Sequence, residues 1–313
     1  MSYADDLFIK MCKDIIENGT KTEGQKVRPV WPDGRKAYTI KQFGVVNRYD
    51  LRKEFPAITL RRTAIKSAMD EILWIFKKKS NNINDLNSHI WDEWADDTGS
   101  IGKAYGYQIG QRFIHHTDVY HEEQLRKYSN LTRNSFPSIQ LDIGYNKMDV
   151  YMDQMDAVLY DLKYNPFSRR IMTNIWNMED LHEMNLQPCC WNCTFSVTDD
   201  GKDKLVLNMV LNQRSNDILA ANNWNVVQYA ILLMMIAQVS DMEAGELLHV
   251  IADAHIYDRH VDIVKELISR ETYPAPIVKL NPEITNFYDF TTSDVIIENY
   301  KHGEQITNIP IAI

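Results

Sequence analysis

The sequence predicts an α+β fold in which helices pack on a mixed, largely antiparallel sheet. Helical stretches and period-two strand stretches both occur, and they do not alternate strictly as βαβ units would. The 313 residues are 44% hydrophobic and 25% charged, which is enough to bury a large core. Because there is no linker, composition shift or internal repeat, we expect a single domain over residues 1–313.

Each predicted element follows from a local pattern. Residues 5–17 place apolar side chains on one helical stripe that ends at Gly19. Residues 63–79 form a second amphipathic helix, whose three final lysines suit its C-terminal dipole. The remaining expectations are a helix at 149–163, a strand at 170–176, a hairpin at 193–214 turning at Asp199-Asp200-Gly201, a buried helix at 224–239, a strand at 245–257 and a helix at 259–269.

Composition and charge exclude several classes of protein. The net charge of -9 argues against a general nucleic-acid binder, which needs a basic face. The start of the chain, MSYADDLFIKMCKDII, is acidic and amphipathic, unlike a signal peptide. The longest apolar stretch, residues 226–239, contains two glutamines and is too short to span a bilayer. We therefore expect a cytoplasmic protein with no membrane partner and no obligatory nucleic acid.

Three of the four cysteines fall within LQPCCWNCTFSV at residues 186–197. Without a secretory signal, free thiols are favoured over disulfides. Cys190 and Cys193 have the spacing of a zinc pair, but no second pair of Cys or His stands at ligand spacing, so we expect no metal. A thioredoxin-like motif would open a helix, whereas this one opens a strand. The remaining interpretation is that one of these cysteines is a nucleophile and that the others only lie near it.

Arginines gather in two short segments. In NQRSND at 212–217, Arg214 follows a strand and precedes Ser215, an arrangement suited to clamping a phosphate or oxyanion. The alternative is an ordinary surface ion pair. NPFSRR at 165–170 adds Arg169 and Arg170 before another strand. Together the two segments carry enough positive charge to bind one phosphate group.

Nine blocks in order resemble the thymidylate synthase family along almost the whole chain. They are DEILWIF at 70–76, IWDEWAD at 90–96, AYGYQ at 104–108, SRR at 168–170, PC at 188–189, QRSND at 213–217, Asn225, DAHIY at 253–257 and the terminal PIAI. The resemblance implies a homodimeric methyltransferase that converts dUMP to dTMP, with methylenetetrahydrofolate donating both carbon and hydride. Residues 112–147 match no family motif and are expected to be an insertion.

The resemblance assigns the catalytic roles. In the family a thiolate adds to carbon 6 of uracil, so that carbon 5 can attack the folate methylene, and Cys189 after Pro188 matches this nucleophile. Cys190 and Cys193 are expected to be small buried hydrophobes. Glu71 matches the carboxylate that relays protons through water, with a helix-surface ion pair as the alternative. Tyr105 matches the residue linked to removal of the carbon-5 proton.

Asn225 is expected to select the base. A carboxamide can donate to the uracil carbonyl and accept from the adjacent ring N–H, whereas cytosine presents the reverse pattern and suits aspartate. The other binding residues are implied by the family. Arg28, Arg214, Gln213 and Ser215 are assigned to the phosphate and nucleotide, Arg169 and Arg170 to the nucleotide of the neighbouring subunit, His255 and Tyr257 to the sugar, and Trp91, Trp94, Asp217 and Ile313 to folate and site closure.

Several departures from the family pattern leave open whether the covalent intermediate is reduced by hydride or attacked by water. They are Cys190, Thr194 for glutamine, Ala221 for glycine and Asn223-Trp224 for a Pro-Phe pair. In related pyrimidine hydroxymethylases water attacks the same covalent intermediate, so a dUMP hydroxymethylase is the alternative enzyme. A nucleotide-binding module without activity would lack Cys189 or Glu71, and both are present. A cysteine hydrolase using Cys189 and His255 would need an orienting Asn or Asp, for which no pattern is found.

Overall fold

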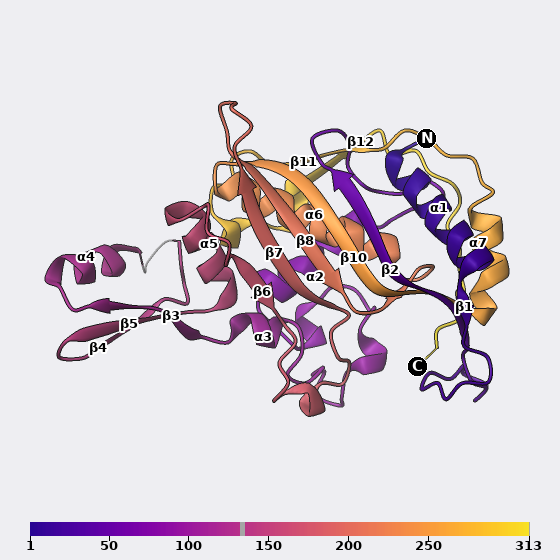
Figure 1. Cartoon of the computed structure of the whole chain (residues 1–313), viewed down its shortest axis with the longest axis horizontal. Coiled ribbons are helices and arrows are strands. Elements are labelled where there is room, and N and C mark those ends of the chain that lie inside the picture. The colour runs from indigo at the N-terminus through magenta and orange to yellow at the C-terminus, as the bar shows by residue number, and fades with distance from the viewer. Residues whose placement is uncertain (132–134, 313) are drawn as a thin grey trace.

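The computed structural model describes residues 1–131 and 135–312, and a seven-stranded sheet forms its centre (Figure 1). The strand order is β1-β2-β10-β8-β7-β6, with β9 beside β10. Only β8 and β9 run parallel to β10; the other pairs are antiparallel, which confirms the predicted mixed, largely antiparallel sheet. The bounds are β1 Thr20–Lys21, β2 Thr39–Asp50, β6 Met172–Asn174, β7 Cys190–Thr198, β8 Val206–Gln213, β9 Asn216–Asp217 and β10 Glu243–Tyr257.

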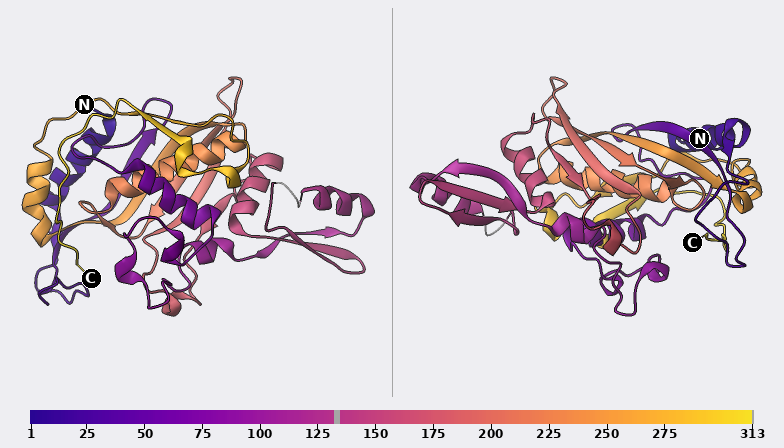
Figure 2. Two further views of the ribbon diagram at one scale, coloured as in Figure 1. Left: turned by 180° about the vertical axis from the view of Figure 1, so that it is seen from behind. Right: turned by 60° about the horizontal axis from the view of Figure 1, so that its bottom comes forward.

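Helices cover one face of this sheet. Viewed from behind, α6 (Asn222–Val239) and α2 (Ile65–Ile72) lie across it (Figure 2). As predicted, α6 is buried on almost all sides, because it lies between the sheet and the outer segments. The predicted helix at 63–79 continues past α2 as a π-helical turn, Leu73–Lys77. The other helices of the main body are α1 Tyr3–Asn18, α3 Gly106–Gly110, α5 Gln154–Tyr164 and α7 Val261–Leu267.

The opposite face of the sheet is open in the described residues (Figure 1). Directly paired residues across the strands share a face, and one such row contains Arg48, Leu248, Val210, Thr194 and Met172. None of these five side chains is fully buried. The next residue on each strand belongs to a buried row on the helix side of the sheet, where α6 covers β10 and β8 and α1 covers β2. The sheet therefore has one packed face and one partly apolar open face.

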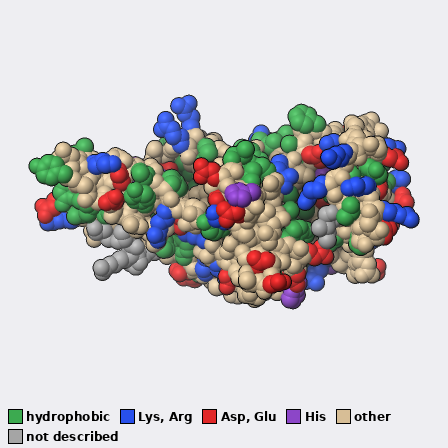
Figure 3. Space-filling model, turned by 90° about the horizontal axis from the view of Figure 1, so that it is seen from below, with side chains coloured by type: hydrophobic (Ala, Val, Ile, Leu, Met, Phe, Trp, Pro, Cys, Tyr) green, Lys and Arg blue, Asp and Glu red, His purple; other side chains and the backbone are tan. Residues whose placement is uncertain are grey.

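The described residues between 113 and 152 form an arm that projects from the main body (Figures 1 and 2). It contains β3 (Phe113–Val119), α4 (Glu122–Leu131), β4 (Gln140–Ile143) and β5 (Lys147–Met152), with β5 between the other two strands. Hydrophobic side chains are visible on its surface (Figure 3). The arm coincides with the expected insertion at 112–147, except that its sheet continues to Met152.

Some sequence predictions were incomplete or wrong. The predicted start of the helix at 149–163 is too early, because residues 149–152 belong to β5 and pair with β3 and β4. Helix α5 begins after Asp153, whose side chain accepts a hydrogen bond from the Asp156 amide at 3.0 Å and so caps the first turn. Strand β2 and the hairpin of β11 (Ile277–Leu280) and β12 (Val295–Glu298) were not predicted. Within the described residues, every helix is too short or too polar to traverse a bilayer.

Candidate active site

The β7–β8 hairpin brings Cys189 and Arg214 together. Cys189 immediately precedes β7, Arg214 immediately follows β8, and the Arg214 amide donates to the Cys189 carbonyl at 2.9 Å. The guanidinium is fixed by backbone carbonyls, with Nε 2.9 Å from Pro188 O and Nη2 2.8 Å from Gln187 O. This arrangement leaves Nη2 at 3.8 Å from Cys189 Sγ. The predicted nucleophile and the predicted phosphate-binding arginine are therefore in contact.

Burial and nearby cations act on the Cys189 thiol in opposite directions. Burial raises the pKa of Cys189 above its ordinary value, and the guanidinium groups of Arg214 and Arg28 oppose that rise. The net shift is upward because desolvation of the thiolate is the larger effect.

Glu71 lies at the end of α2 with only 5% of its surface exposed, so the alternative of a helix-surface ion pair is wrong. Two indoles hold its carboxylate: Trp91 Nε1 donates to Oε1 at 2.9 Å, and Trp224 Nε1 donates to Oε2 at 2.7 Å. Burial raises the pKa of Glu71 to about 7, and these two donors limit the rise. A carboxyl group with this pKa can both take up and release a proton near neutral pH.

Tyr105 connects the carboxylate and the cysteine. Its hydroxyl accepts a hydrogen bond from the Cys189 amide at 3.4 Å, and its ring lies edge-on to Trp91 with centroids 4.8 Å apart. The backbone at Tyr105 has φ 47°, a left-handed value that is unfavourable for a residue with a Cβ. Burial raises its pKa well above the ordinary value, so the hydroxyl stays neutral. The strained turn aims this side chain at Cys189.

Asn225 stands in the first turn of α6 within a group of amides. Gln213 Nε2 donates to Asn225 Oδ1 at 3.1 Å, and Asn216 Nδ2 donates to the same oxygen at 3.3 Å. Asn225 Nδ2 donates to Gln228 Oε1 at 3.1 Å. The side chain keeps part of its surface exposed. Its amide is thus oriented by protein groups: one Nδ2 hydrogen is left for a base, and Oδ1 already accepts two hydrogen bonds, of which the one from Asn216 is long.

The predicted sugar-binding pair lies on β10. His255 Nδ1 is 2.9 Å from Asp253 Oδ1, and Asp253 also bonds Lys41 Nζ at 2.9 Å. The rings of His255 and Tyr257 are edge-on with centroids 5.1 Å apart. Burial raises the pKa of Tyr257 to about 12, so its hydroxyl is neutral. Both residues present polar groups on the side of β10 that adjoins Asp217.

Asp217 is linked to the C-terminal segment. Its Oδ1 accepts the amides of Leu219 and Ala220 at 3.0 and 3.1 Å. Burial acts to raise the Asp217 pKa, but contact with His260 outweighs it and the pKa is lowered. His260 Nδ1 is 3.6 Å from Asp217 Oδ1, while its Nε2 donates to the Pro310 carbonyl at 2.7 Å. One imidazole therefore joins a predicted folate residue to the chain's last residues; Ile313 itself lies outside the described residues.

The other predicted arginines are exposed. Arg28 lies in the loop before β2, close enough to Cys189 and Tyr257 to favour their ionised forms. Arg169 and Arg170 lie between α5 and β6, and neither guanidinium forms an ion pair within the described residues. These two side chains are not brought to the Cys189 site of their own chain by any contact described.

The two remaining predicted residues lie beside the same site. Ser215 contributes its backbone carbonyl, which accepts from Gln213 Nε2 at 3.0 Å. Trp94 is partly exposed and packs edge-on against Trp91, with ring centroids 5.7 Å apart. The Trp pair therefore forms one wall next to Glu71.

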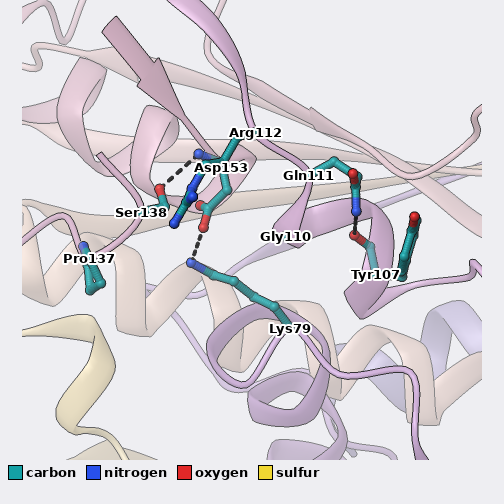
Figure 4. A pocket seen from close by; sticks show the side chains of 8 residues that line it. All are labelled: Lys79, Tyr107, Gly110, Gln111, Arg112, Pro137, Ser138 and Asp153. Atoms are coloured by element: carbon teal, nitrogen blue, oxygen red, sulfur yellow. Dashed lines mark hydrogen bonds and ion pairs between the residues drawn. The ribbon is translucent and has the colours of Figure 1, made fainter. Parts of the chain in front are cut away.

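A separate cavity of about 650 Å³ lies at the base of the arm (Figure 4). Its lining residues are Lys79, Tyr107, Gly110, Gln111, Arg112, Pro137, Ser138 and Asp153. None of them is a predicted site residue. Lys79 is already paired with Asp153 and donates to the Tyr288 hydroxyl at 2.9 Å. Among the described residues, no group of three or more His, Cys, Asp or Glu side chains is placed to hold a metal ion.

Sequence reasoning missed several residues that organise the site: Trp224, Gln228, His249 and His260. Trp224 was noted only as a departure from the family. One signal was available for Gln228, because a polar residue three positions after Asn225 lies on the same side of an otherwise apolar helix. No local pattern could have paired Trp224 with Glu71, which is 153 residues away in the chain.

Comparison with known proteins shows the family of this chain. A family model described as thymidylate synthase matches residues 6–313. The thymidylate synthase of Bacillus licheniformis is 38% identical over 311 residues and that of Bacillus phage phi3T is 37% identical over 310 residues, each alignment covering 98% of both proteins. The solved structure of thermostable thymidylate synthase A from Bacillus subtilis covers 100% of both chains with a TM-score of 0.82 and 36% sequence identity.

The fold and the site define a methyltransferase of nucleotide metabolism. The chain belongs to the thymidylate synthase family, whose members bind dUMP and use methylenetetrahydrofolate as co-substrate. The relatives named above are all thymidylate synthases, so the hydroxymethylase alternative gains no support from them.

Proposed function

We propose that this protein catalyses the reductive methylation of dUMP to dTMP, with methylenetetrahydrofolate as the donor of carbon and hydride. The observation that carries the proposal is the placement of Cys189 Sγ 3.8 Å from Arg214 Nη2, on a hairpin whose end also orients Asn225 through Gln213. A thiol, a guanidinium and a base-reading amide in one place match addition of sulfur to a phosphate-anchored pyrimidine.

Cys189 is the proposed nucleophile, and its sulfur bonds carbon 6 of the uracil ring. Arg214 has two functions in this scheme: its guanidinium binds the nucleotide phosphate and also favours the thiolate. Arg28 adds a second positive charge to the same site. Because burial alone would keep the thiol protonated, these two arginines make the reactive form accessible.

Glu71 and Tyr105 are assigned to proton transfer, and Asn225 is assigned to binding the base. Glu71, with a pKa of about 7, exchanges protons with the pyrimidine carbonyl through water. The neutral hydroxyl of Tyr105, held at the Cys189 amide, is placed to assist removal of the carbon-5 proton. Asn225 accepts from the ring N–H and donates to the neighbouring carbonyl, which favours uracil over cytosine.

The residues assigned to folate fit such a ligand chemically. Asp217 uses only Oδ1 in the hydrogen bonds of the described residues, so Oδ2 can accept the N–H donors of a pterin ring. Trp91 and Trp94 supply an aromatic wall. When bound, methylenetetrahydrofolate supplies the carbon and the hydride. The C-terminal segment, fixed through His260 and ending at Ile313, is proposed to close the site and exclude water.

The functional unit is proposed to be a homodimer that pairs the open faces of two sheets. That face contains apolar residues such as Val46, 54% exposed, beside Val250 on the next strand. An uncovered, partly apolar sheet face is a typical protein interface. Arg169 and Arg170 are exposed near β6 at one border of the sheet, and we assign them to the phosphate of the partner's nucleotide.

We further propose that the chain is one domain over 1–313, with the arm as an insertion in it, and that the protein acts in the cytoplasm. The buried residues Tyr128 and Phe136 of the arm belong to the same continuous hydrophobic core as the main body, which supports a single folding unit.

The activity is tested with purified protein, dUMP and methylenetetrahydrofolate. We expect dTMP and dihydrofolate in equal amounts, the latter followed by its absorbance. A hydroxymethylase would instead leave tetrahydrofolate, and no product at all would refute both enzymes. Cys189→Ser is the matched control, because it replaces only the sulfur and should abolish both products and the covalent complex with fluorinated dUMP.

Mixing inactive variants tests the shared site. In a hybrid of Cys189→Ala with an Arg169→Ala/Arg170→Ala chain, one site keeps its own cysteine and receives intact arginines from the other subunit. We therefore expect activity to return after the two inactive proteins are unfolded and refolded together. If the arginines serve their own chain, both hybrid sites are defective and the mixture stays inactive.

A further inference from the structure

A buried histidine lies behind the base-reading amide. His249 on β10 has no exposed surface, and its Nε2 is 2.7 Å from Gln213 Oε1 on the neighbouring strand. Its register partner on β8 is Leu211, so Gln213 is two residues further along the same face. That face is covered by α6, which carries Asn225.

The direction of the first hydrogen bond is fixed by chemistry. Gln213 Nε2 donates to the backbone carbonyl of Ser215 at 3.0 Å, and a carbonyl can only accept. Gln213 Oε1 must therefore face His249, and the histidine must carry its hydrogen on Nε2. His249 Nδ1 has no partner in the described residues, which suits a bare lone pair better than an N–H. Burial lowers the pKa of His249 to about 3, so the ring stays neutral.

The same direction continues through three amides. Gln213 donates to Asn225 Oδ1, and Asn225 donates to Gln228 Oε1. Gln228 Nε2 completes no hydrogen bond of its own, but it lies close enough to Glu71 to favour the ionised carboxylate. Every donor in this series points away from His249 and toward Glu71. The Nε2–H of His249 therefore favours this orientation of Gln213, and the donors of Gln213 and Asn216 together favour that of Asn225.

We propose that His249 is a positioning residue that fixes the amide orientation of Gln213 and, through it, of Asn225, and so contributes to the choice of uracil over cytosine. The inference rests on the proposed function for its substrate. If Gln213 turned over, its oxygen would face the Ser215 carbonyl and it would offer Asn225 an acceptor. Asn225 Oδ1 would then lose its 3.1 Å hydrogen bond from Gln213 and keep only the 3.3 Å one from Asn216, so the amide orientation that suits uracil would be less strongly favoured.

Two nearly isosteric variants isolate the donor. His249→Gln places an N–H where Nε2 now lies, whereas His249→Met has similar size and shape but no donor. Binding of dUMP and dCMP to each protein is measured by calorimetry without folate, so that no turnover is needed. We expect His249→Met to lose about tenfold in the preference for dUMP, the cost of one unpaired buried acceptor, and His249→Gln to retain the wild-type preference.

The tautomer gives an independent readout. Long-range proton–nitrogen NMR of protein labelled at its histidines should show His249 with hydrogen on Nε2, unchanged from about pH 5 to about pH 9. Its signals are identified by their absence in His249→Gln, so the measurement does not depend on whether His249→Met folds.

The outcomes separate this inference from the proposed function. A hydrogen on Nδ1, or equal dUMP preference in the Met, Gln and wild-type proteins, would overturn the role of His249 even in an active enzyme. Wild-type protein that binds neither nucleotide would instead refute the proposed function, and the tautomer would still decide whether His249 orients Gln213.

Discussion

Replacing Trp224 by Phe tests how the site controls the proton on Glu71. The substitution keeps an aromatic ring at the start of α6 but removes the N–H that donates to Glu71 Oε2 at 2.7 Å. Trp91 still donates to Oε1. The other titratable groups that act on the carboxylate or are affected by it are Asp70, Tyr105, Cys190 and Tyr229. None of these is a cation, so nothing compensates for the lost donor and the pKa of Glu71 should rise.

The size of the effect follows from the hydrogen bond. A bond to a charged group contributes about 1.5 to 3 kcal/mol, and one pKa unit corresponds to about 1.4 kcal/mol. The pKa of Glu71 should therefore move from about 7 to about 8 or 9. For a carboxyl whose folded pKa is raised, the stabilising effect is present below the unfolded pKa and is lost as pH rises through the folded pKa. The donor-dependent loss of stability in Trp224→Phe should thus be absent near pH 5 and reach about 1.4 to 2.7 kcal/mol in alkaline solution.

Urea unfolding at fixed protein concentration, near pH 5 and near pH 9, measures this difference. The smaller aromatic ring should lower the free energy of unfolding by the same amount at both pH values. Only the part of the loss that depends on the indole donor should increase with pH. Tyr300→Phe is the control, because it also removes one hydrogen-bond donor, a partly buried hydroxyl that donates at 2.8 Å to the backbone carbonyl of Ile58, a group that does not titrate. If Trp224→Phe costs the same at both pH values, as the control should, the indole does not govern the charge on Glu71.

Three further changes have defined outcomes. Arg214→Met should raise the pKa of Cys189 further and slow its alkylation by iodoacetamide at about pH 8 by roughly tenfold, because the largest effect opposing burial is removed; an unchanged rate would contradict that role. In His260→Asn, the loss of thermal stability should be larger at about pH 6 than at about pH 9. Contact with Asp217 outweighs burial and raises the pKa of His260. The stabilising effect of the protonated imidazole is therefore lost as the pH rises through this raised pKa. Asn225→Asp should weaken dUMP binding and favour dCMP in calorimetry, because a protonated carboxyl can donate to the cytosine ring nitrogen while its carbonyl accepts from the amino group.

The parts of the fold that were predictable are those with long, regular patterns. Helix α6 is apolar on nearly all sides from residue 226 onward, and the β7–β8 hairpin combines alternation with a recognisable turn at residues 199–201. The start of α5 was misplaced because MDVYM, at residues 148–152, suits either a strand or a helix, and only pairing with β3 and β4 decides for the strand. Strand β2 was overlooked because its mixture of polar and apolar residues gives no clear period.

The candidate site was predictable as a set of residues but not as a set of contacts. Motif blocks point to Cys189, Arg214 and Glu71 regardless of their distance in the sequence. Their hydrogen-bond partners depend on which elements pack together, and that information is not local. Trp224 reaches Glu71 only because α6 crosses α2, and His249 reaches Gln213 only because β10 lies beside β8. Residues that orient the site therefore emerge from the tertiary structure.

Burial is the dominant influence on the reactive groups of this site. It raises the pKa of Cys189, Tyr105 and Glu71, so each tends to keep its proton, and the guanidinium groups of Arg214 and Arg28 oppose this effect at Cys189. Such a site attracts a phosphate before it offers a fully developed nucleophile. Under the proposed mechanism, an apolar interior that holds protons, with cations beside the thiol, favours sulfur addition only once a nucleotide is anchored.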